Sequence, residues 1–402
     1  MSPLHSPERI ARLHLPGRGA GSEPSIVAVE DRLSAFASKH SIEHDLTSAS
    51  TSAFPPPPYF LDGVVAAVRD GRPGYTSLRG DHGVREALAP SLSRLLGTEV
   101  DPAEVVLTAG TQGGLFATLA ALVDDGDRVL IADPEYLCTE RVAQFLGARV
   151  IHVPFTRLGR DGALDLDVVE RGLREGARVV AFSNPHNPTG TVIGADALAE
   201  LAELVIAADA WVLADELYAR FVYDDGPVPH MAAIPGMRER CVTALGPSKT
   251  ESASGFRIGV LVGPTGLLDE VTRVVEITTV RAPAYAQYAL EPWLRDDDAF
   301  VRERVDVYRR LRDVTVERLS RVEGVAVSSP AATAWLFPDL SGLGRSEEEI
   351  VQALIEAGIL VMPGTSFGPA GGGHVRLCFG QHEATWPSVI DRVADVLDGL
   401  RR

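Results

Sequence analysis

Short apolar runs alternate with stretches of helical periodicity through the middle of the chain. Between the runs, apolar residues recur every three or four positions, as in Gly113–Leu122, where Leu115, Leu119 and Leu122 share one face, and in Glu140–Leu146. Strands that alternate with helices predict an α/β fold with a mainly parallel sheet covered by helices on both faces. The predicted strands are Glu104–Leu107, Arg128–Ala132, Arg149–Val153, Val179–Ser183, Trp211–Ala214 and Cys241–Leu245.

The segments outside this region have other patterns. A proline run over residues 55–58 is typical of a stiff connector, and a helix over Leu61–Asp70 and a glycine-rich loop over Gly71–Gly83 follow it. A long helix is predicted over Phe300–Val322. The rest of the chain predicts a small mixed unit, with strands at Val325–Val327, Ala334–Phe337, Leu360–Val361 and His374–Cys378 and helices at Glu347–Ala357 and from Thr385 onward.

These changes of pattern divide the chain into three parts. Residues 1–50 form an N-terminal segment of weak pattern, which we expect to pack with the small domain. Residues 51–290 form a large α/β domain, and residues 291–402 form a smaller α+β domain.

Charge and cysteine content indicate the class of partner and the compartment. The 38 basic and 55 acidic residues give a net charge of −17, which argues against a nucleic-acid partner. The three cysteines are scattered, and neither a signal peptide nor an apolar run of about 18 residues is visible, so we expect a cytoplasmic protein without a membrane span. His40 and His44 have the spacing of a helical pair but no third ligand, so no metal site is predicted.

Two residue types are unusually scarce. Lys39 and Lys249 are the only lysines of the chain, and Asn184 and Asn187 are the only asparagines. A compositional bias toward arginine explains the scarcity in general. Such a bias leaves lysine in place where an amine is needed, because arginine is always charged and cannot act as an amine nucleophile.

Several of the predicted strands are followed by polar or small residues. Gly110–Gly114 suits either a tight turn or an anion site at a helix N-terminus, and Asn184–Gly190 is a stiff loop that holds both asparagines. Asp215 follows a buried strand, where it either caps a helix or pairs with a buried cation. Lys249 also follows a strand, where a partly desolvated lysine has a lowered pKa and can form a Schiff base.

Together these segments resemble the class I/II aminotransferases, which use pyridoxal 5′-phosphate (PLP) on a type I fold. The resemblance extends from about Leu46 to Leu400. It rests on Asn-Pro-Thr-Gly at 187–190, Asp-x-x-Tyr at 215–218, Ser-Lys at 248–249 with arginine eight residues on, Tyr-x-x-x-Arg-Gly at 75–80, and Pro-Gly-Thr-Ser-Phe-Gly at 363–368 with Arg376 beyond. It implies the large domain of fold type I, with its seven-stranded type of sheet, and a smaller C-terminal domain.

The resemblance also implies how the cofactor is bound. Lys249 forms the internal aldimine with the cofactor aldehyde, Asp215 pairs with the pyridine nitrogen, and Tyr136 stacks on the ring. The ring O3′ is bonded by Asn187 and Tyr218. The phosphate is bound by Gly110, Thr111, Gln112, Ser248 and Arg257 of one subunit and by Tyr75 of its neighbour, which implies a homodimer with shared active sites.

On the substrate side, Arg376 binds the α-carboxylate together with Asn187. Lys249, Asp215 and Tyr218 are the predicted catalytic residues. The predicted function is PLP-dependent transfer of an amino group between a small amino acid and a 2-keto acid. The alternative is a PLP-dependent lyase, decarboxylase or oxidase on the same scaffold, since all these reactions begin with the same linkage to the cofactor.

Three further observations bear on this reading. Leu46–Ser52 contains no glycine, although many relatives have one near the substrate carboxylate, and Gly246 stands where many have serine.

A regulator built from the same fold adds a DNA-binding module. Residues 1–50 carry five basic and six acidic residues and show no helix-turn-helix pattern, which argues against that class.

Overall fold

An eight-stranded sheet forms the centre of the larger lobe in the computed structural model, which describes residues 8–11, 13, 26–50, 52–72, 74–224 and 226–401. The strand order is β2-β9-β8-β7-β6-β3-β4-β5, and the pairs β8-β7, β7-β6, β6-β3 and β3-β4 are parallel. This confirms the predicted α/β class with a mainly parallel sheet. The strands are β2 (Val105–Thr108), β3 (Arg128–Asp133), β4 (Arg149–Arg157), β5 (Ala163–Leu164), β6 (Ala177–Ser183), β7 (Trp211–Asp215), β8 (Cys241–Leu245) and β9 (Gly259–Val262).

Strand β9 was not predicted, and it runs antiparallel to both β2 and β8. The chain returns from β8 through a loop without a long crossover helix, so the next strand has to run in the opposite direction. The four residues of β9 are all buried between their two neighbours.

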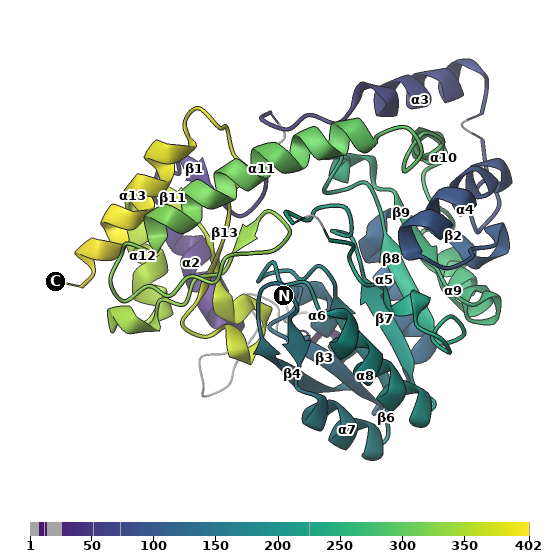
Figure 1. The fold of residues 1–402 in the computed structure, drawn as a ribbon, viewed down its shortest axis with the longest axis horizontal. Coiled ribbons are helices and arrows are strands. Elements are labelled where there is room, and N and C mark those ends of the chain that lie inside the picture. The colour runs from purple at the N-terminus through teal and green to yellow at the C-terminus, as the bar shows by residue number, and fades with distance from the viewer. Residues whose placement is uncertain are drawn as a thin grey trace, which may run out of the picture.

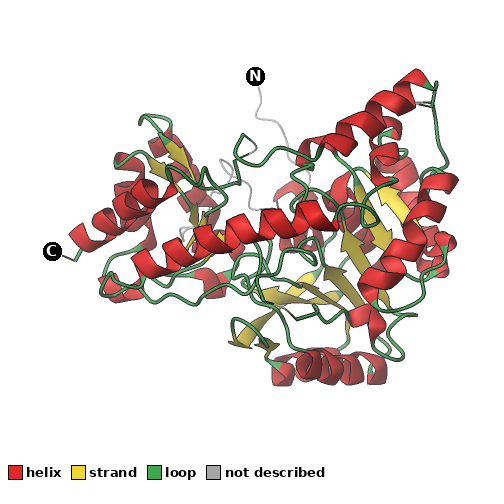
Figure 2. Ribbon diagram, turned by 45° about the horizontal axis from the view of Figure 1, so that its top comes forward, coloured by secondary structure: helices red, strands yellow, loops and turns green. Residues whose placement is uncertain are grey.

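Both faces of the sheet are covered, because neighbouring residues of a strand point to opposite sides. Leu130 and Val180 pack in one buried cluster with helices α7 (Leu166–Arg174) and α8 (Ala195–Ala207). Ile131 and Val179 pack in another with three helices on the opposite face (Figure 2). These helices are α5 (Gly110–Leu122), α6 (Leu137–Phe145) and α9 (Thr265–Thr278).

At the β2-β9 edge, further helices build a third apolar cluster. Leu88 and Leu92 of α4 (His82–Leu96) and Phe60 of α3 (Pro58–Arg69) pack there with Leu107. Tyr288 and Trp293, which follow α10 (Ala284–Gln287), complete the cluster.

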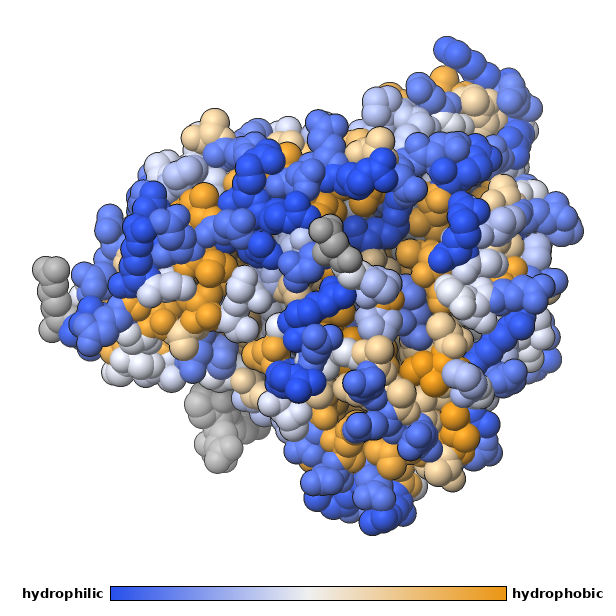
Figure 3. Space-filling model, viewed as in Figure 1, coloured by the Kyte–Doolittle hydropathy of each residue, from blue (hydrophilic) through white to orange (hydrophobic). Residues whose placement is uncertain are grey.

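The smaller lobe consists of helices packed on short strands. Helix α11 (Asp298–Leu319) runs from the larger lobe to the smaller one (Figure 1), and Figure 3 shows hydrophilic side chains along its exposed side. Strand β13 pairs antiparallel with both β10 and β12. The elements are α12 (Glu347–Glu356), α13 (Trp386–Gly399), β10 (Trp335–Leu336), β11 (Ile359–Leu360), β12 (Met362–Pro363) and β13 (Val375–Cys378).

From residue 26 onward the N-terminal segment contacts this smaller lobe, whereas α1 (Glu8–Ala11) contacts α6 of the larger lobe. Strand β1 (His44–Asp45) pairs parallel with β11, and α2 (Ile26–Ala37) lies beside α12. Apart from α1 and Leu13, residues 1–25 of the expected segment lie outside the described residues. The division of the chain at residues 50 and 290 stays a prediction.

One predicted strand of the smaller lobe is wrong. The structure shows no strand over Val325–Val327, and only Ala326 forms an isolated bridge, to Asp339. The valine alternation there comes from a loop whose apolar side chains pack against the lobe's core. Among the helices that the structure describes, none has the length and apolarity required to span a bilayer.

Candidate active site

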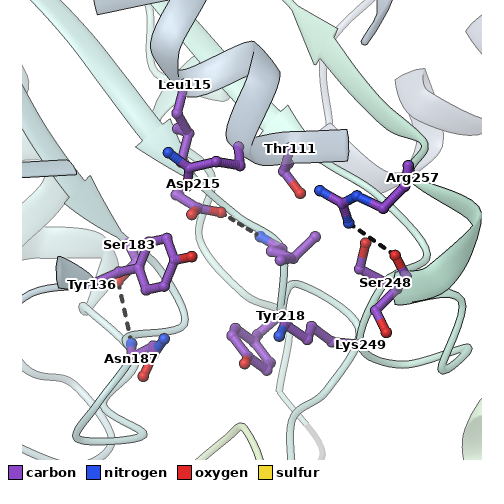
Figure 4. A pocket seen from close by; sticks show the side chains of 13 residues that line it. Thr111, Leu115, Tyr136, Ser183, Asn187, Asp215, Tyr218, Ser248, Lys249 and Arg257 are labelled. Carbon is purple, nitrogen blue, oxygen red and sulfur yellow. Dashed lines mark hydrogen bonds between the residues drawn. The ribbon is translucent and has the colours of Figure 1, made fainter. Parts of the chain in front are cut away.

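A cavity of about 600 Å³ opens where the parallel strands end (Figure 4). The loops after β3, β6, β7 and β8 all reach it, because the carboxyl ends of parallel strands meet at one edge of a sheet. Most of the predicted site residues line this cavity: Thr111, Gln112, Tyr136, Asn187, Asp215, Tyr218, Ser248, Lys249 and Arg257.

The N-terminus of α5 forms one wall of the cavity. Gly110 begins the helix with φ of 74°, and a Cβ on it would lie 2.4 Å from Nη2 of Arg257. Glycine is therefore required for the arginine to lie against this turn. Arg257 donates through Nη1 to the carbonyl oxygen of Ser254 at 2.8 Å. The helix N-terminus, the guanidinium and the nearby Ser248 make a cradle of donors suited to a phosphate group.

Asp215 and Lys249 lie in the middle of the cavity. Asp215 ends β7 and accepts a hydrogen bond of 3.1 Å from the backbone N–H of Leu217. Burial raises the pKa of its carboxyl to about 6, although this hydrogen bond and Lys249 act in the opposite direction.

The pKa of Lys249 is lowered, first by burial and then by the positive charge of Arg376, while Cys378 and Asp215 oppose the shift. A larger fraction of this lysine is therefore the free amine, which is the nucleophilic form. Figure 4 shows its side chain beside Tyr218.

Arg376 on β13 contacts the cavity wall from the smaller lobe through Asn187. Its Nη1 donates to Oδ1 of Asn187 at 3.0 Å, and its Nη2 donates to the carbonyl oxygen of Thr47 at 3.1 Å. The guanidinium lies 3.8 Å from the ring centroid of Trp335 and 4.6 Å from that of Phe367. Burial lowers its pKa to about 10, so it remains charged at neutral pH.

Its Nε is buried and has no partner among the described residues. With two of five N–H groups engaged, the guanidinium retains donors for a carboxylate.

A second hollow of about 540 Å³ adjoins the cavity. It shares Lys249 and Tyr218 with the cavity and extends to Trp335 and Ser48 of the smaller-lobe side. The space between the lysine amine and the arginine is thus continuous with a partly aromatic recess, which offers room for a substrate side chain.

Tyr75 lies away from the cavity. It is 93% exposed, and its ring contacts the guanidinium of Arg281 at 4.4 Å. Its own chain therefore does not bring it to the cofactor site.

Several residues of the site were missed from the sequence. Trp335 donates through Nε1 to the hydroxyl oxygen of Tyr218 at 2.7 Å and also supports Arg376. Glu135 and Ser183 form a buried pair behind the cavity wall. Glu135 and Ser183 are next to residues already singled out, Tyr136 and Asn184, and this adjacency was the available signal. Trp335 had none beyond its place in a predicted strand.

The fold and this site define a class of enzyme, and comparison with known proteins identifies the family. Residues 59–393 match the family model for class I and II aminotransferases, so the chain belongs to this family. It is a PLP-dependent aminotransferase, whose substrates are an amino acid and a keto acid.

Individual relatives agree with the family. The chain is 31% identical over 337 residues to an arginine–pyruvate transaminase of Pseudomonas aeruginosa, covering 83% of this chain and 84% of the relative. The crystal structure of an aspartate aminotransferase from Rhodobacter sphaeroides is similar with a TM-score of 0.85 at 34% identity, over 90% of this chain and 93% of the other. N-succinyldiaminopimelate aminotransferase from Mycobacterium tuberculosis gives a TM-score of 0.84 at 28% identity, covering 98% and 100% of the two chains.

The residues present fit this cofactor. The donor cradle at α5 suits its phosphate, and the carboxyl of Asp215 suits a pyridinium nitrogen. The unpartnered Nε of Arg376 indicates that a ligand is still needed at the other end of the cavity.

Proposed function

We propose that Lys249, Asp215 and Tyr218 catalyse the transfer of an amino group from a small amino acid to a 2-keto acid. One observation carries the proposal. A buried lysine and a buried aspartate share one cavity with the α5 N-terminus, and Asn187 of the cavity wall accepts a hydrogen bond from Arg376, whose Nε has no partner among the described residues. PLP, when bound, supplies an aldehyde that accepts an amine and a protonated ring that withdraws electrons from the substrate Cα.

Each proposed contact with the cofactor oxygen O3′ uses a donor that is not already engaged in a hydrogen bond within the protein. Oδ1 of Asn187 already accepts from Arg376, so its Nδ2 is left to donate to the ring oxygen O3′. The oxygen of Tyr218 already accepts from Trp335, so its hydroxyl proton can be directed at the same O3′. Asp215 would keep the pyridine nitrogen protonated, and Tyr136 would cover the ring face.

At the phosphate end, the backbone N–H groups of Gly110, Thr111 and Gln112 point from the start of α5 toward the proposed phosphate position. The hydroxyl of Ser248 and the guanidinium of Arg257 complete this contact from the other side of the cradle.

Lys249 would hold the cofactor covalently through its amine, and this amine would be freed when the substrate amine takes its place. Its free amine, with a lowered pKa, then acts as the base that removes the Cα proton of the substrate. Arg376, together with Asn187, holds the α-carboxylate, and this fixes the position of Cα relative to Lys249.

We further propose a cytoplasmic homodimer in which Tyr75 of each subunit contacts the phosphate in the other. The 93% exposure of Tyr75 supports this arrangement, and three cysteines without a disulfide suit a reducing compartment. We also propose a large domain of residues 51–290, a small domain of residues 291–402, and residues 1–50 as a segment belonging with the latter.

The test is the half-reaction with an amino donor alone. We expect the absorbance of the bound cofactor to change to that of its aminated form with at least one member of a broad amino-acid panel. Lys249→Ala should abolish the covalently bound cofactor, whereas Lys39→Ala, an exposed lysine, should retain it. Release of ammonia, carbon dioxide or peroxide without a keto-acid acceptor would contradict transamination.

A further inference from the structure

Glu135 is a buried carboxyl group for which the proposed mechanism has no use. Its side chain is 4% exposed, and both of its oxygens are hydrogen-bonded. Oε1 accepts from the backbone N–H of Tyr136 at 2.6 Å and from the hydroxyl of Ser183 at 2.7 Å. Oε2 accepts from the backbone N–H of Ser183 at 2.7 Å.

No described cation balances a charge on this carboxyl. The nearest ionisable ring, that of His186, has its Nε2 3.7 Å from Oε2 of Glu135, and burial lowers the pKa of that imidazole to about 3. The three donors therefore hold Glu135 in place by hydrogen bonding. Two segments of the chain supply these three donors. Because all three donate to the same buried side chain, Glu135 fixes the position of the two segments relative to each other.

The two segments joined in this way are both walls of the cavity. One contains Tyr136, directly after Glu135, and the other contains Asn187, whose backbone N–H donates to Oγ of Ser183 at 3.2 Å. Oδ1 of Asn187 in turn accepts from Arg376. A continuous chain of hydrogen bonds therefore runs from Tyr136 through Glu135, Ser183 and Asn187 to Arg376.

The backbone of Glu135 adds a link to the smaller lobe. Its N–H donates to the carbonyl oxygen of Phe367 at 2.7 Å, and the Phe367 ring lies against the guanidinium of Arg376. Glu135 thus contacts both segments that fix the position of Arg376.

We propose that Glu135 is a positioning residue that sets the mutual geometry of Tyr136, Asn187 and Arg376. The inference rests on the proposed roles of these three residues in binding cofactor and substrate. Without the carboxyl, the loops after β3 and β6 lose their shared acceptor, and a misplacement of about 1 Å can cost on the order of 10²-fold in rate.

Substitution by alanine and by glutamine separates positioning from packing. Glu135→Ala removes all three acceptor contacts, and we expect KM for the amino donor and Kd for the cofactor each to rise about 10-fold or more. The circular dichroism of the bound cofactor should fall, because it reports the asymmetric contacts of the ring. Glu135→Gln keeps the oxygen that accepts from Tyr136 and Ser183 Oγ but turns an NH2 group toward the backbone N–H of Ser183, so its KM and Kd should lie between those of the wild type and of Glu135→Ala.

Ser183→Ala provides a second test, in the other of the two segments. It removes the hydroxyl that links Glu135 to Asn187 but leaves the backbone N–H of residue 183 in place. We expect KM to rise about 5-fold, and the double variant with Glu135→Ala to be less impaired than the product of the single effects.

The matched control is Glu140→Ala. Glu140 is a partly buried glutamate of α6 that accepts from Gln144 at 2.7 Å and lies 3.3 Å from His152. It does not line the cavity, so its loss should lower thermal stability without changing KM or the cofactor signal.

The outcomes distinguish this inference from the proposed function. If the wild type transaminates while Glu135→Ala and Ser183→Ala keep KM, Kd and dichroism within 2-fold, only the positioning role is overturned. If Glu135→Ala does not fold, the KM and Kd values of Ser183→Ala and of Glu135→Gln test the positioning role instead. If the wild type shows no half-reaction with any amino acid, the proposed function fails instead.

Discussion

The indole Nε1 of Trp335 donates a hydrogen bond of 2.7 Å to the hydroxyl oxygen of Tyr218, and the same indole lies 3.8 Å from the guanidinium of Arg376. One side chain of the smaller lobe therefore contacts both a proposed cofactor ligand and the proposed carboxylate ligand. Because the oxygen of Tyr218 is already an acceptor, its proton is free for a partner inside the cavity.

Trp335→Phe separates these two contacts. Phenylalanine keeps an aromatic face for Arg376 but cannot donate to Tyr218, so the loss of about 1 kcal/mol should lower kcat about 5-fold and leave KM nearly unchanged. Trp335→Leu removes the aromatic face as well and should also raise KM. Steady-state kinetics with the best donor would measure both effects. Equal kcat values for wild type and Trp335→Phe would contradict the role of the hydrogen bond.

Asp215→Asn should affect stability and activity in opposite directions. The pKa of Asp215 is raised to about 6 in the cofactor-free fold, so folding favours the protonated form, and stability is lost as pH rises through about 6. Asparagine does not ionise. We therefore expect the cofactor-free variant to be about 1–3 kcal/mol more stable than the wild type at pH 8 and equally stable below about pH 4.

Urea denaturation at the two pH values measures this difference. The loaded variant should lose on the order of 10²-fold in kcat, because no anion then keeps the ring nitrogen protonated. A cofactor-free variant that is less stable than the wild type at pH 8 would contradict the stated burial cost.

Arg304 connects the lysine loop to helix α11. Its Nη1 donates to Oγ of Ser252 at 2.7 Å, and its Nη2 donates to the carbonyl oxygen of Pro55 at 2.8 Å. Ser252 lies three residues after Lys249 and has φ of 54°, a conformation that costs energy in a non-glycine residue. The buried arginine therefore holds a strained turn beside the reactive amine.

Arg304→Met should lower the free energy of unfolding by about 1–2 kcal/mol, because the hydroxyl of the half-buried Ser252 and the carbonyl oxygen of the exposed Pro55 lose a charged donor. Arg302→Met, an exposed site on the same helix, should change it by less than about 0.5 kcal/mol. Urea denaturation midpoints provide the comparison. Similar midpoints for the two variants would show that the Ser252 and Pro55 contacts contribute little.

Sharing of Tyr75 between subunits predicts complementation. Tyr75→Ala and Lys249→Ala should each impair the homodimer, the first through weaker phosphate binding. A mixed dimer contains one site with an intact Lys249 and an intact Tyr75 from the other chain, so each mixed dimer should have about half the activity of the wild type, and an equimolar mixture in which about half of the dimers are mixed should recover about a quarter. The measurement is turnover after refolding the two variants together. Recovery would not occur if each site used its own Tyr75.

The sequence was sufficient to predict much of the site, because the predicted residues follow buried strands. In a parallel sheet the carboxyl ends of the strands meet at one edge whatever the details of packing, and the resemblance to the class I/II aminotransferases assigned Asn187, Asp215 and Lys249 to one site there. Strand β9 and the loop at Val325–Val327 could not be assigned this way. A short apolar run does not encode the direction of a strand or whether it finds a partner.

The sequence by itself determined the fold class, and the scarcity of lysine singled out Lys249 as the proposed reactive amine. These features depend on local pattern and on residue chemistry. Tertiary structure alone decided that Trp335 supports both Tyr218 and Arg376, and that Glu135 joins the segments of Tyr136 and Asn187. Such contacts link residues far apart in the chain, and they arise from the packing of the two lobes and of neighbouring strands, which no local pattern records.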